Sequence, residues 1–408
     1  MAGGGNAARG NVNFMPVILD KKQNFESHFR HSDEEASPGY YGVLLDDYHI
    51  KVALTSTIRT GLHKYTFPQS KQSAIVLKLA HGSLEINDNE ISGSDNSVYF
   101  VAEFSKPVSE FEIINNDKLA SNSNSVKGNN IKGIFKFETE KKEIILLKVG
   151  ISMVSIDGAR NNLKTELSGW DFEKTLKQSK EAWNKELGKI EVEGGTKTEQ
   201  IIFYTALYHA MIHPNIYMDV DKKYRSESGE IYTAANFDNY TNFSLWDTFR
   251  ALHPLYTLIN RDKTSQFIRT FLSRYDHNGR MLIMEFNGVQ GEKPPMIAYH
   301  SLSVLADAYV KGIRDYNVPK AYEAMKKLAN DLDRTGKQLY LDYGFIPYDL
   351  KGQNVSRSLE YSYDDWCVTR LAKDFNEKDL LYFSQRGDFY KNSFSKKENF
   401  MVGRKSNF

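Results

Sequence analysis

Hydrophobic and polar side chains alternate with a period of two over short runs in the first 160 residues. The clearest runs are residues 50–55, 75–79 and 98–104, and turn-forming segments such as SPG, FPQS and NDNE separate the runs of this region. This period places alternate side chains on opposite faces of a strand, so it predicts antiparallel strands with one covered face. The continuously apolar run EIILLKVGISMV predicts a central strand buried on both sides. Several short strands in about a hundred residues favour a β-sandwich.

The spacing changes to that of amphipathic helices after Ser168. In the segment GWDFEKTLKQSKEAWNKELGKIEV the apolar residues follow a helical period, which predicts a charged connecting helix. Helical patterns then dominate, for example in residues 263–276, 298–313 and 361–375. A run of helical hairpins after a sandwich predicts a helical barrel with its function at the loop ends. We therefore divide the chain into a β-sandwich at 1–160, a helical linker at 161–198 and a helical domain at 199–408.

Composition and charge exclude several classes of partner. The 408 residues exceed what one hydrophobic core usually serves, so at least two domains are expected. Lys and Arg number 53 against 52 Asp and Glu, so no bulk attraction to nucleic acid or an anionic membrane is implied. No run of 18 apolar residues predicts a membrane span, and the first residues lack the pattern of a secretory signal. The single cysteine, Cys367, excludes an internal disulfide.

The first candidate for chemistry is the segment TNFSLWDTFRALHPLY, which holds Trp246, Asp247 and Arg250. Asp247 and Arg250 are three residues apart, so on a helix they share a face and can bond one another or a common ligand. Charged groups inside apolar flanks must be paired or used, because an unpaired buried charge is costly. An indole beside a carboxylate suits a sugar site. A purely structural Asp–Arg ion pair is the alternative interpretation.

Further candidates are Glu292, His300 and the pair Asp364 and Asp365. Glu292 stands before a predicted helix, whose dipole favours the ionised carboxylate, so a general acid there would need burial or a nearby negative charge. An ordinary first-turn glutamate and a core histidine are the alternatives for Glu292 and His300. Asp364 and Asp365 are adjacent and point to different helix faces. At most one of them is expected to face a site, and the other is expected to cap a helix or pair outside.

Several segments together give the chain a family resemblance. It resembles glycoside hydrolase family 92, the calcium-dependent exo-acting α-mannosidases common in gut Bacteroidetes. The resemblance covers nearly the whole chain in family order, and SLWDTFRALHP and EYSYDDWC are its most specific motifs. The other matching segments are SPGYYGVLLDDYHIKVALTSTIRTGLHKYTFP, KVGISMVSIDGARNNL, FYTALYHAMIHPN and MIAYHSLSVLADAYVKGI.

The resemblance implies a β-sandwich followed by an (α/α)6 barrel, with the sugar bound between them. It implies hydrolysis of terminal α-mannosides with inversion, which needs one carboxylic acid and one carboxylate base. Glu292 matches the general acid, and Asp247 matches a carboxylate that accepts hydrogen bonds from mannose hydroxyls. Trp246 and Arg250 would shape that subsite, and His300 is also expected to bind substrate. Calcium, which prefers oxygen ligands, is the implied cofactor.

The chain also departs from the family pattern. Lys293 and Ala298 stand where the family usually has threonine and glycine. Family chains are longer at both ends, and we expect the general base and most calcium ligands beyond Phe408. The expected fold is thus a β-sandwich followed by an incomplete (α/α)6 barrel, in a fragment of a longer protein. The intact protein is expected in the periplasm, on the cell surface or outside the cell.

Three hypotheses for function follow. The first is an α-mannosidase acting on mannose-containing glycans, such as those of N-glycoproteins. The second, favoured for the 408-residue chain itself, is a catalytically inactive remnant that binds carbohydrate. The third is another sandwich-plus-barrel enzyme, such as a disaccharide phosphorylase. That enzyme would need a phosphate site of basic and hydroxyl residues, which the sequence does not offer.

Overall fold

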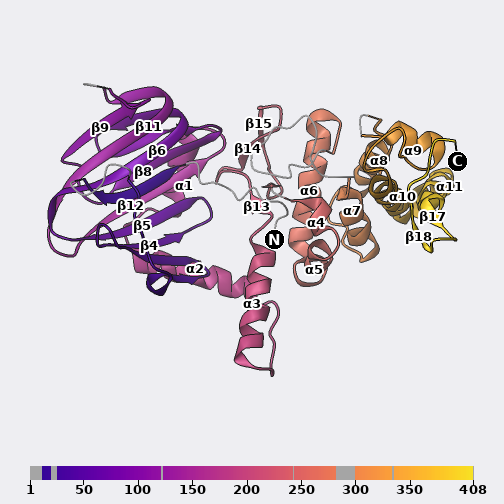
Figure 1. Ribbon diagram of the computed structural model, residues 1–408, viewed down its shortest axis with the longest axis horizontal. Coiled ribbons are helices and arrows are strands. Elements are labelled where there is room, and N and C mark those ends of the chain that lie inside the picture. The colour runs from indigo at the N-terminus through magenta and orange to yellow at the C-terminus, as the bar shows by residue number, and fades with distance from the viewer. Residues whose placement is uncertain are drawn as a thin grey trace. The chain divides into compact units, whose positions relative to one another are not determined.

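The computed structural model describes residues 12–19, 25–120, 123–241, 243–281, 299–332 and 335–407. The described residues form two compact units, one built mainly of strands and one mainly of helices (Figure 1). The strand unit holds the described residues up to Met211 together with Tyr217–Ala235. The helical unit holds Ile212–Ile216 and the described residues from Asn236 onward. The predicted order of a β domain followed by a helical domain is confirmed.

The strand unit is built on one 12-stranded antiparallel sheet with the order β10-β9-β11-β6-β7-β8-β12-β5-β4-β3-β2, to which β1 adds beside β6. A short 3-10 helix at His31–Asp33 precedes β2. The strands are β1 (Asn13–Ile18), β2 (Glu35–Ser37), β3 (Tyr40–Leu45), β4 (Ile50–Ser56), β5 (Thr60–Phe67), β6 (Ser70–Asn87), β7 (Glu90–Asp95), β8 (Val98–Phe104), β9 (Glu110–Asn115), β10 (Lys118–Leu119), β11 (Ser125–Thr139) and β12 (Glu143–Ser152).

Strand β12 is a central strand, as its continuous apolar run predicts. It pairs with β5 on one side and β8 on the other. Ile145 and Leu147 enter the main core of the sheet, whereas Leu146 packs with a second cluster on the opposite face. Helices α1 (Ile156–Glu166) and α2 (Phe172–Leu187) contribute to that second cluster, so they cover one face of the sheet.

The helices of the strand unit begin at side-chain caps. Ser155 accepts a hydrogen bond from the backbone N–H of Gly158 at the start of α1. Asp171 does the same for Lys174 at the start of α2. Such caps satisfy backbone donors that the first helical turn leaves free. Helix α3 (Lys197–Met211) follows α2.

Residues Tyr217–Ala235 are fastened to the strand unit by buried polar contacts. Their hairpin consists of β14 (Lys223–Arg225) and β15 (Ile231–Thr233). The Asp219 carboxylate accepts hydrogen bonds from Ser152 Oγ at 2.7 Å and from Asn162 Nδ2 at 2.8 Å. Burial raises the pKa of Asp219, and these two donors oppose that effect. These contacts explain why residues Tyr217–Ala235 belong to the strand unit.

The helical unit is organised around α10, which packs against α7, α8 and α11. Helices predicted at 263–276, 298–313 and 361–375 are present as α6, α7 and α10. The elements are β13 (Asn215–Ile216), β16 (Tyr240–Thr241), α4 (Leu245–Thr248), α5 (Leu252–Ile259), α6 (Arg261–Asn278), α7 (Ser301–Val310), α8 (Val318–Ala329), α9 (Lys337–Tyr343), α10 (Asn354–Phe375), α11 (Glu377–Gly387), a 3-10 helix (Asp388–Ser393), β17 (Phe394–Ser395) and β18 (Phe400–Met401).

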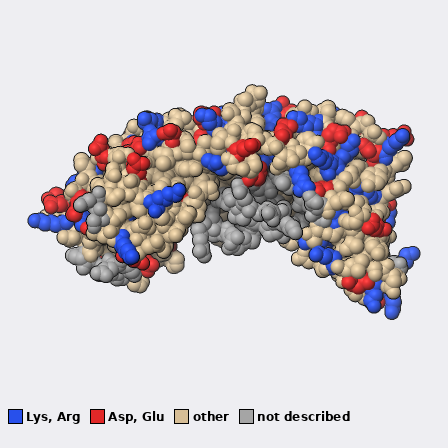
Figure 2. All heavy atoms as spheres, turned by 90° about the horizontal axis from the view of Figure 1, so that it is seen from above, with Lys and Arg blue, Asp and Glu red and all other residues tan. Residues whose placement is uncertain are grey.

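The surface carries both signs of charge. Figure 2 shows basic and acidic side chains interspersed over the face in view, which fits the formal net charge of +1. Such mixing gives no extended field of one sign that would attract a polyanion. Within the described ranges, no helix is both long and apolar enough to cross a membrane.

Candidate active site

The Trp-Asp turn of the helical unit is held in a strained backbone conformation. Ser244, which precedes the short helix α4, has φ 44° and ψ 55°, the left-handed region that non-glycine residues seldom adopt. Its hydroxyl donates a hydrogen bond to Asp247 Oδ2 at 2.6 Å, and its carbonyl accepts one from Asp247 N at 3.0 Å. The Asp247 side chain is exposed, and its Oδ1 has no partner among the described residues. One carboxylate oxygen is thus fixed while the other stays available.

Trp246, the residue before Asp247, adds a hydrogen-bond donor that has no partner among the described residues. The residue is half-buried, and its indole Nε1 is buried without a partner among the described residues. Buried indole N–H groups usually find an acceptor, so an unpaired one is a candidate contact for a ligand. Trp246 and Asp247 together therefore offer an aromatic face, a donor and an acceptor within two consecutive residues.

Arg250 does not pair with Asp247, the partner that the three-residue spacing suggests. Helix α4 ends at Thr248, so Arg250 lies beyond it and does not share a helix face with Asp247. Its Nη2 instead bonds Glu360 Oε1 on α10 at 3.0 Å. The guanidinium also lies over the Phe249 ring, 4.5 Å from its centroid. Asp247 is therefore not neutralised by Arg250.

His300 is held between two carboxylates at the start of α7. Its side chain is 1% exposed, with Nε2 2.9 Å from Glu360 Oε2 and Nδ1 3.0 Å from Asp364 Oδ1. The Phe249 ring stacks on it at a centroid distance of 3.9 Å. Burial by itself lowers the pKa of His300, but Asp364 and Glu360 outweigh it and raise the pKa to about 9. The ring is therefore an imidazolium at neutral pH.

Arg250, Glu360, His300 and Asp364 form a connected set that we call the Glu360 network. Burial favours the neutral acid at Glu360, but His300 and Arg250 outweigh it and lower the pKa of Glu360. Two cations and two carboxylates thus balance. Sequence reasoning missed Glu360, although Glu360 and Asp364 are four residues apart and share one face of α10.

Asp365 faces a second, fully buried network. It accepts hydrogen bonds from Arg386 Nε at 2.9 Å and Nη2 at 2.8 Å, and from the Tyr340 hydroxyl at 2.8 Å. Asp364 points the other way, where it accepts from Tyr299 N at 3.0 Å as well as facing His300. Both aspartates are 0% exposed, so neither pairs outside as one was expected to do.

Lys337 belongs to this second network. Its ammonium lies 3.7 Å from Asp365 Oδ1 and faces the rings of Tyr299, Tyr340 and Tyr361, each 4.7 or 4.8 Å from the ring centroid. Burial lowers the pKa of Lys337 to about 7. This cluster lies in the core of the helical unit, so its role is structural.

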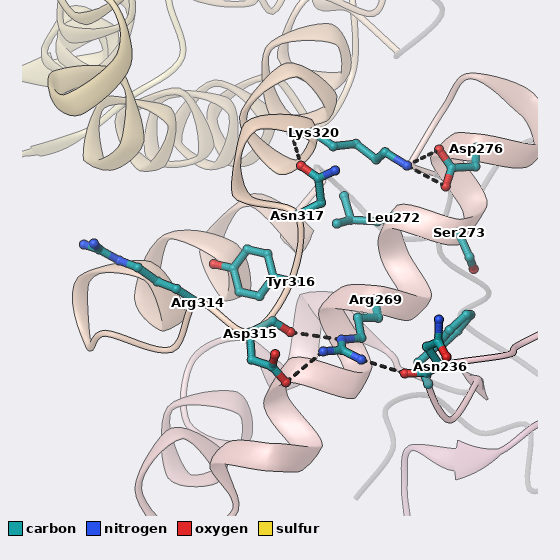
Figure 3. A pocket seen from close by; sticks show the side chains of 11 residues that line it. Asn236, Arg269, Leu272, Ser273, Asp276, Arg314, Asp315, Tyr316, Asn317 and Lys320 are labelled. Carbon is teal, nitrogen blue, oxygen red and sulfur yellow. Dashed lines mark hydrogen bonds and ion pairs between the residues drawn. The ribbon is translucent and has the colours of Figure 1, made fainter.

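A cavity of about 540 Å³ lies elsewhere in the helical unit, between α6 and the residues that lead into α8. Figure 3 shows Arg269 directed toward Asp315 and Lys320 directed toward Asp276. Arg269 pairs with Asp315 at 2.8 Å and Lys320 with Asp276 at 2.8 Å. None of the site residues predicted from sequence lines it. We interpret these pairs as ties between α6 and the start of α8.

Two family sequence models match the chain. The N-terminal domain of glycosyl hydrolase family 92 matches residues 1–152, and the catalytic domain of the same family matches residues 158–408. The chain belongs to glycosyl hydrolase family 92. The family resemblance drawn from the motifs is thereby confirmed.

Solved structures of family 92 members share this fold. A family 92 α-mannosidase from Bacteroides thetaiotaomicron is 34% identical, with a TM-score of 0.91 over 98% of this chain and 59% of that chain. An inverting family 92 mannosidase from the same organism is 26% identical, with a TM-score of 0.90 over 97% of this chain and 57% of that chain. A protein of Arthroderma benhamiae described as an uncharacterised secreted glycosidase is 23% identical over 99% of this chain and 56% of its own length. The chain thus spans less than two thirds of each of these relatives.

Two expectations for this family 92 chain concern parts or groups that the structure does not show. Glu292, predicted as the general acid, lies outside the described residues, so its distance from Asp247 stays a prediction. Within the described part, no group of three His, Cys, Asp or Glu side chains is arranged to hold a metal ion. The calcium implied by the family resemblance therefore stays a prediction.

Proposed function

We propose that the protein acts as an inverting, exo-acting α-mannosidase on mannose-containing glycans, including those of N-glycoproteins. The observation that carries the proposal is the Trp246–Asp247 pair, which offers a carboxylate oxygen and an indole N–H that have no partner among the described residues. It occurs in a family 92 chain whose relatives of known structure include an α-mannosidase that was also solved in complex with mannoimidazole. The curated relative is described as secreted, which supports a location outside the cytoplasm.

The roles follow from the chemistry of each group. Asp247 would accept hydrogen bonds from mannose hydroxyls, and the Trp246 ring would pack on the C–H face of the sugar. Arg250 would donate to an oxygen of the bound sugar. Glu292 would give its proton to the glycosidic oxygen as the bond from that oxygen to the anomeric carbon breaks. A water oxygen would bond to that carbon from the opposite face and lose its proton to a carboxylate base that we do not assign. The proposal also includes calcium as the cofactor, because the family resemblance implies it.

The decisive experiment measures binding and turnover by the chain. Binding of mannoimidazole is measured by calorimetry, and release of mannose from an aryl α-mannoside is measured with calcium and with a chelator. Binding with calcium-dependent release supports the hydrolase. Binding without release identifies a carbohydrate-binding protein without turnover. No binding and no release would contradict the proposal.

Replacement of Asp247 by alanine is expected to weaken mannoimidazole binding by about 10- to 100-fold, because hydrogen bonds to a charged acceptor are lost. Asp262→Ala is the matched control, since Asp262 is an exposed first-turn carboxylate of α6. The control should bind as the unchanged chain does. Equal affinities for the two variants would remove Asp247 from the site.

The strained backbone at Ser244 gives a separate prediction. Ser244→Ala removes the bond to Asp247 and keeps the unfavourable positive φ, whereas Ser244→Gly removes the bond and relieves the strain. We expect the glycine variant to be more stable than the alanine variant by about 1 kcal/mol. Chemical denaturation measures the difference. An alanine variant as stable as the glycine variant would show that the positive φ carries no cost.

A further inference from the structure

We propose that Glu360 is a positioning residue that holds the Arg250 guanidinium in place for a bound mannoside, with His300 as its buried counter-cation. The inference rests on the proposed function, and it assigns to His300 a supporting role in place of direct contact with the sugar.

Glu360 is the one carboxylate that contacts both cations of its network. Its Oε1 lies 3.0 Å from Arg250 Nη2 and its Oε2 lies 2.9 Å from His300 Nε2. The Glu360 side chain is 14% exposed, whereas the Arg250 side chain is 54% exposed. Among the described residues, Glu360 is the only hydrogen-bond partner of Arg250. Without Glu360, the Phe249 ring would be the remaining contact of the guanidinium within the described part of the chain.

His300 supports Arg250 by a second route through the backbone. Its Nδ1 hydrogen-bonds Asp364, which is 0% exposed, and its Nε2 forms an ion pair with Glu360 at 2.9 Å without the geometry of a hydrogen bond. The same ring stacks on Phe249, the residue that precedes Arg250 in the chain. The imidazolium thus fixes the backbone on which Arg250 stands, while Glu360 fixes its side chain. Direct contact of His300 with substrate would require one of its ion pairs to break.

The consequence for recognition is geometric. An arginine side chain carries five N–H donors in a rigid fork, and Glu360 engages Nη2. The remaining donors can reach a ligand oxygen in an orientation that the network sets beforehand. Pre-ordering of a flexible side chain reduces the entropy lost on binding, so it favours affinity. Glutamine at 360 keeps the size of the side chain but loses the charge that holds both cations.

The test is a double-mutant cycle read by mannoimidazole binding. Glu360→Gln and Arg250→Lys are each expected to weaken binding by about tenfold, and the double variant should be no weaker than Arg250→Lys alone. Glu377→Gln, an exposed carboxylate in the first turn of α11, is the matched control and should bind as the unchanged chain does. Additive losses, or unchanged binding by Glu360→Gln, would overturn the positioning role while leaving the mannosidase proposal intact.

A second readout is independent of any sugar. In the ¹³C-labelled chain the titration midpoint of His300 is followed by NMR, and Glu360→Gln should lower it by at least one pH unit because one of two carboxylates is lost. An unmoved midpoint would overturn the network as the structure shows it. If the unchanged chain binds no mannoimidazole, the proposed function fails together with the sugar role of Glu360. The midpoint then decides separately whether Glu360 holds His300.

Discussion

Replacement of Arg386 by methionine is expected to lower the free energy of unfolding of the helical unit by about 3–5 kcal/mol. Asp365 is 0% exposed and would lose the two hydrogen bonds that Arg386 donates. The carbonyl of Ala329 would lose its donor from Arg386 Nη2 as well. The Lys337 ammonium lies 3.7 Å from Asp365 Oδ1, so it would balance only part of the Asp365 charge. A buried carboxylate without its partner either stays charged at high cost or takes up a proton.

Tryptophan fluorescence can follow this unit alone. Trp246 and Trp366 lie in the helical unit, whereas Trp170 and Trp183 lie in the strand unit. In a background with Trp170→Phe and Trp183→Phe, denaturation by urea therefore reports the helical unit.

Two controls define the origin of the loss. The double variant Asp365→Leu, Arg386→Met removes both charges and should recover at least half of the lost stability, because no buried charge is then left unpaired. Arg357→Met changes a half-buried arginine of α10 that hydrogen-bonds Gln353 near the helix start, and it should alter stability by no more than about 0.5 kcal/mol. A loss below about 1 kcal/mol for Arg386→Met would mean that water or other groups already compensate Asp365.

The period of apolar residues along the chain located most of the helices and strands, because that period arises wherever an element buries one face. β12 was predictable as a central strand, since both of its faces contribute to a core and its run is mainly apolar, with Lys148 as the charged residue inside it. The stretch from Asn115 to Asn130 has the polar, glycine-containing composition of a surface loop, but β10 and the first part of β11 lie within it. β11 begins at Ser125 and pairs there with β6. Its first six side chains are exposed or half-buried, so no alternation marks a strand that backbone hydrogen bonds define.

The site was less accessible to sequence reasoning, because its partners are distant along the chain. The three-residue spacing of Asp247 and Arg250 is meaningful only on a continuous helix, and α4 ends between them. Glu360, the true partner of Arg250, is 110 residues away. Likewise, the adjacency of Asp364 and Asp365 predicts two opposite faces but not that both faces are buried. Tertiary packing decides which charges meet.

The stability that His300 contributes is expected to disappear as the pH rises through about 9. The pKa of His300 is about 9 in the folded chain and 6.5 in the ordinary, unfolded environment. The folded state therefore binds the proton more tightly, so the contribution is fully present below about pH 6.5 and is lost as the pH passes the folded value. The pKa difference corresponds to about 3 kcal/mol. The difference in unfolding free energy between the unchanged chain and His300→Gln should fall by that amount between pH 6 and pH 10.

Lys337 provides the matched opposite case. Burial lowers the pKa of Lys337 from 10.5 to about 7, so the unfolded state binds the proton more tightly between these values and stability rises with pH across that window. Between pH 7 and pH 9 the two slopes, each about 1.4 kcal/mol per pH unit, offset one another. Lys337→Met should show stability falling with pH, and His300→Gln should show it rising.

The two variants separate the two causes. A His300→Gln profile parallel to that of the unchanged chain would mean that the carboxylates of Glu360 and Asp364 do not hold an imidazolium. A Lys337→Met profile parallel to that of the unchanged chain would mean that the three tyrosine rings keep the ammonium charged against burial. The two networks adjoin one another. Tyr299 and Asp365 belong to the buried network, and their chain neighbours His300 and Asp364 belong to the Glu360 network. Opposite pH dependences in the two variants would therefore show that the Glu360 network and the buried network around Asp365 titrate separately.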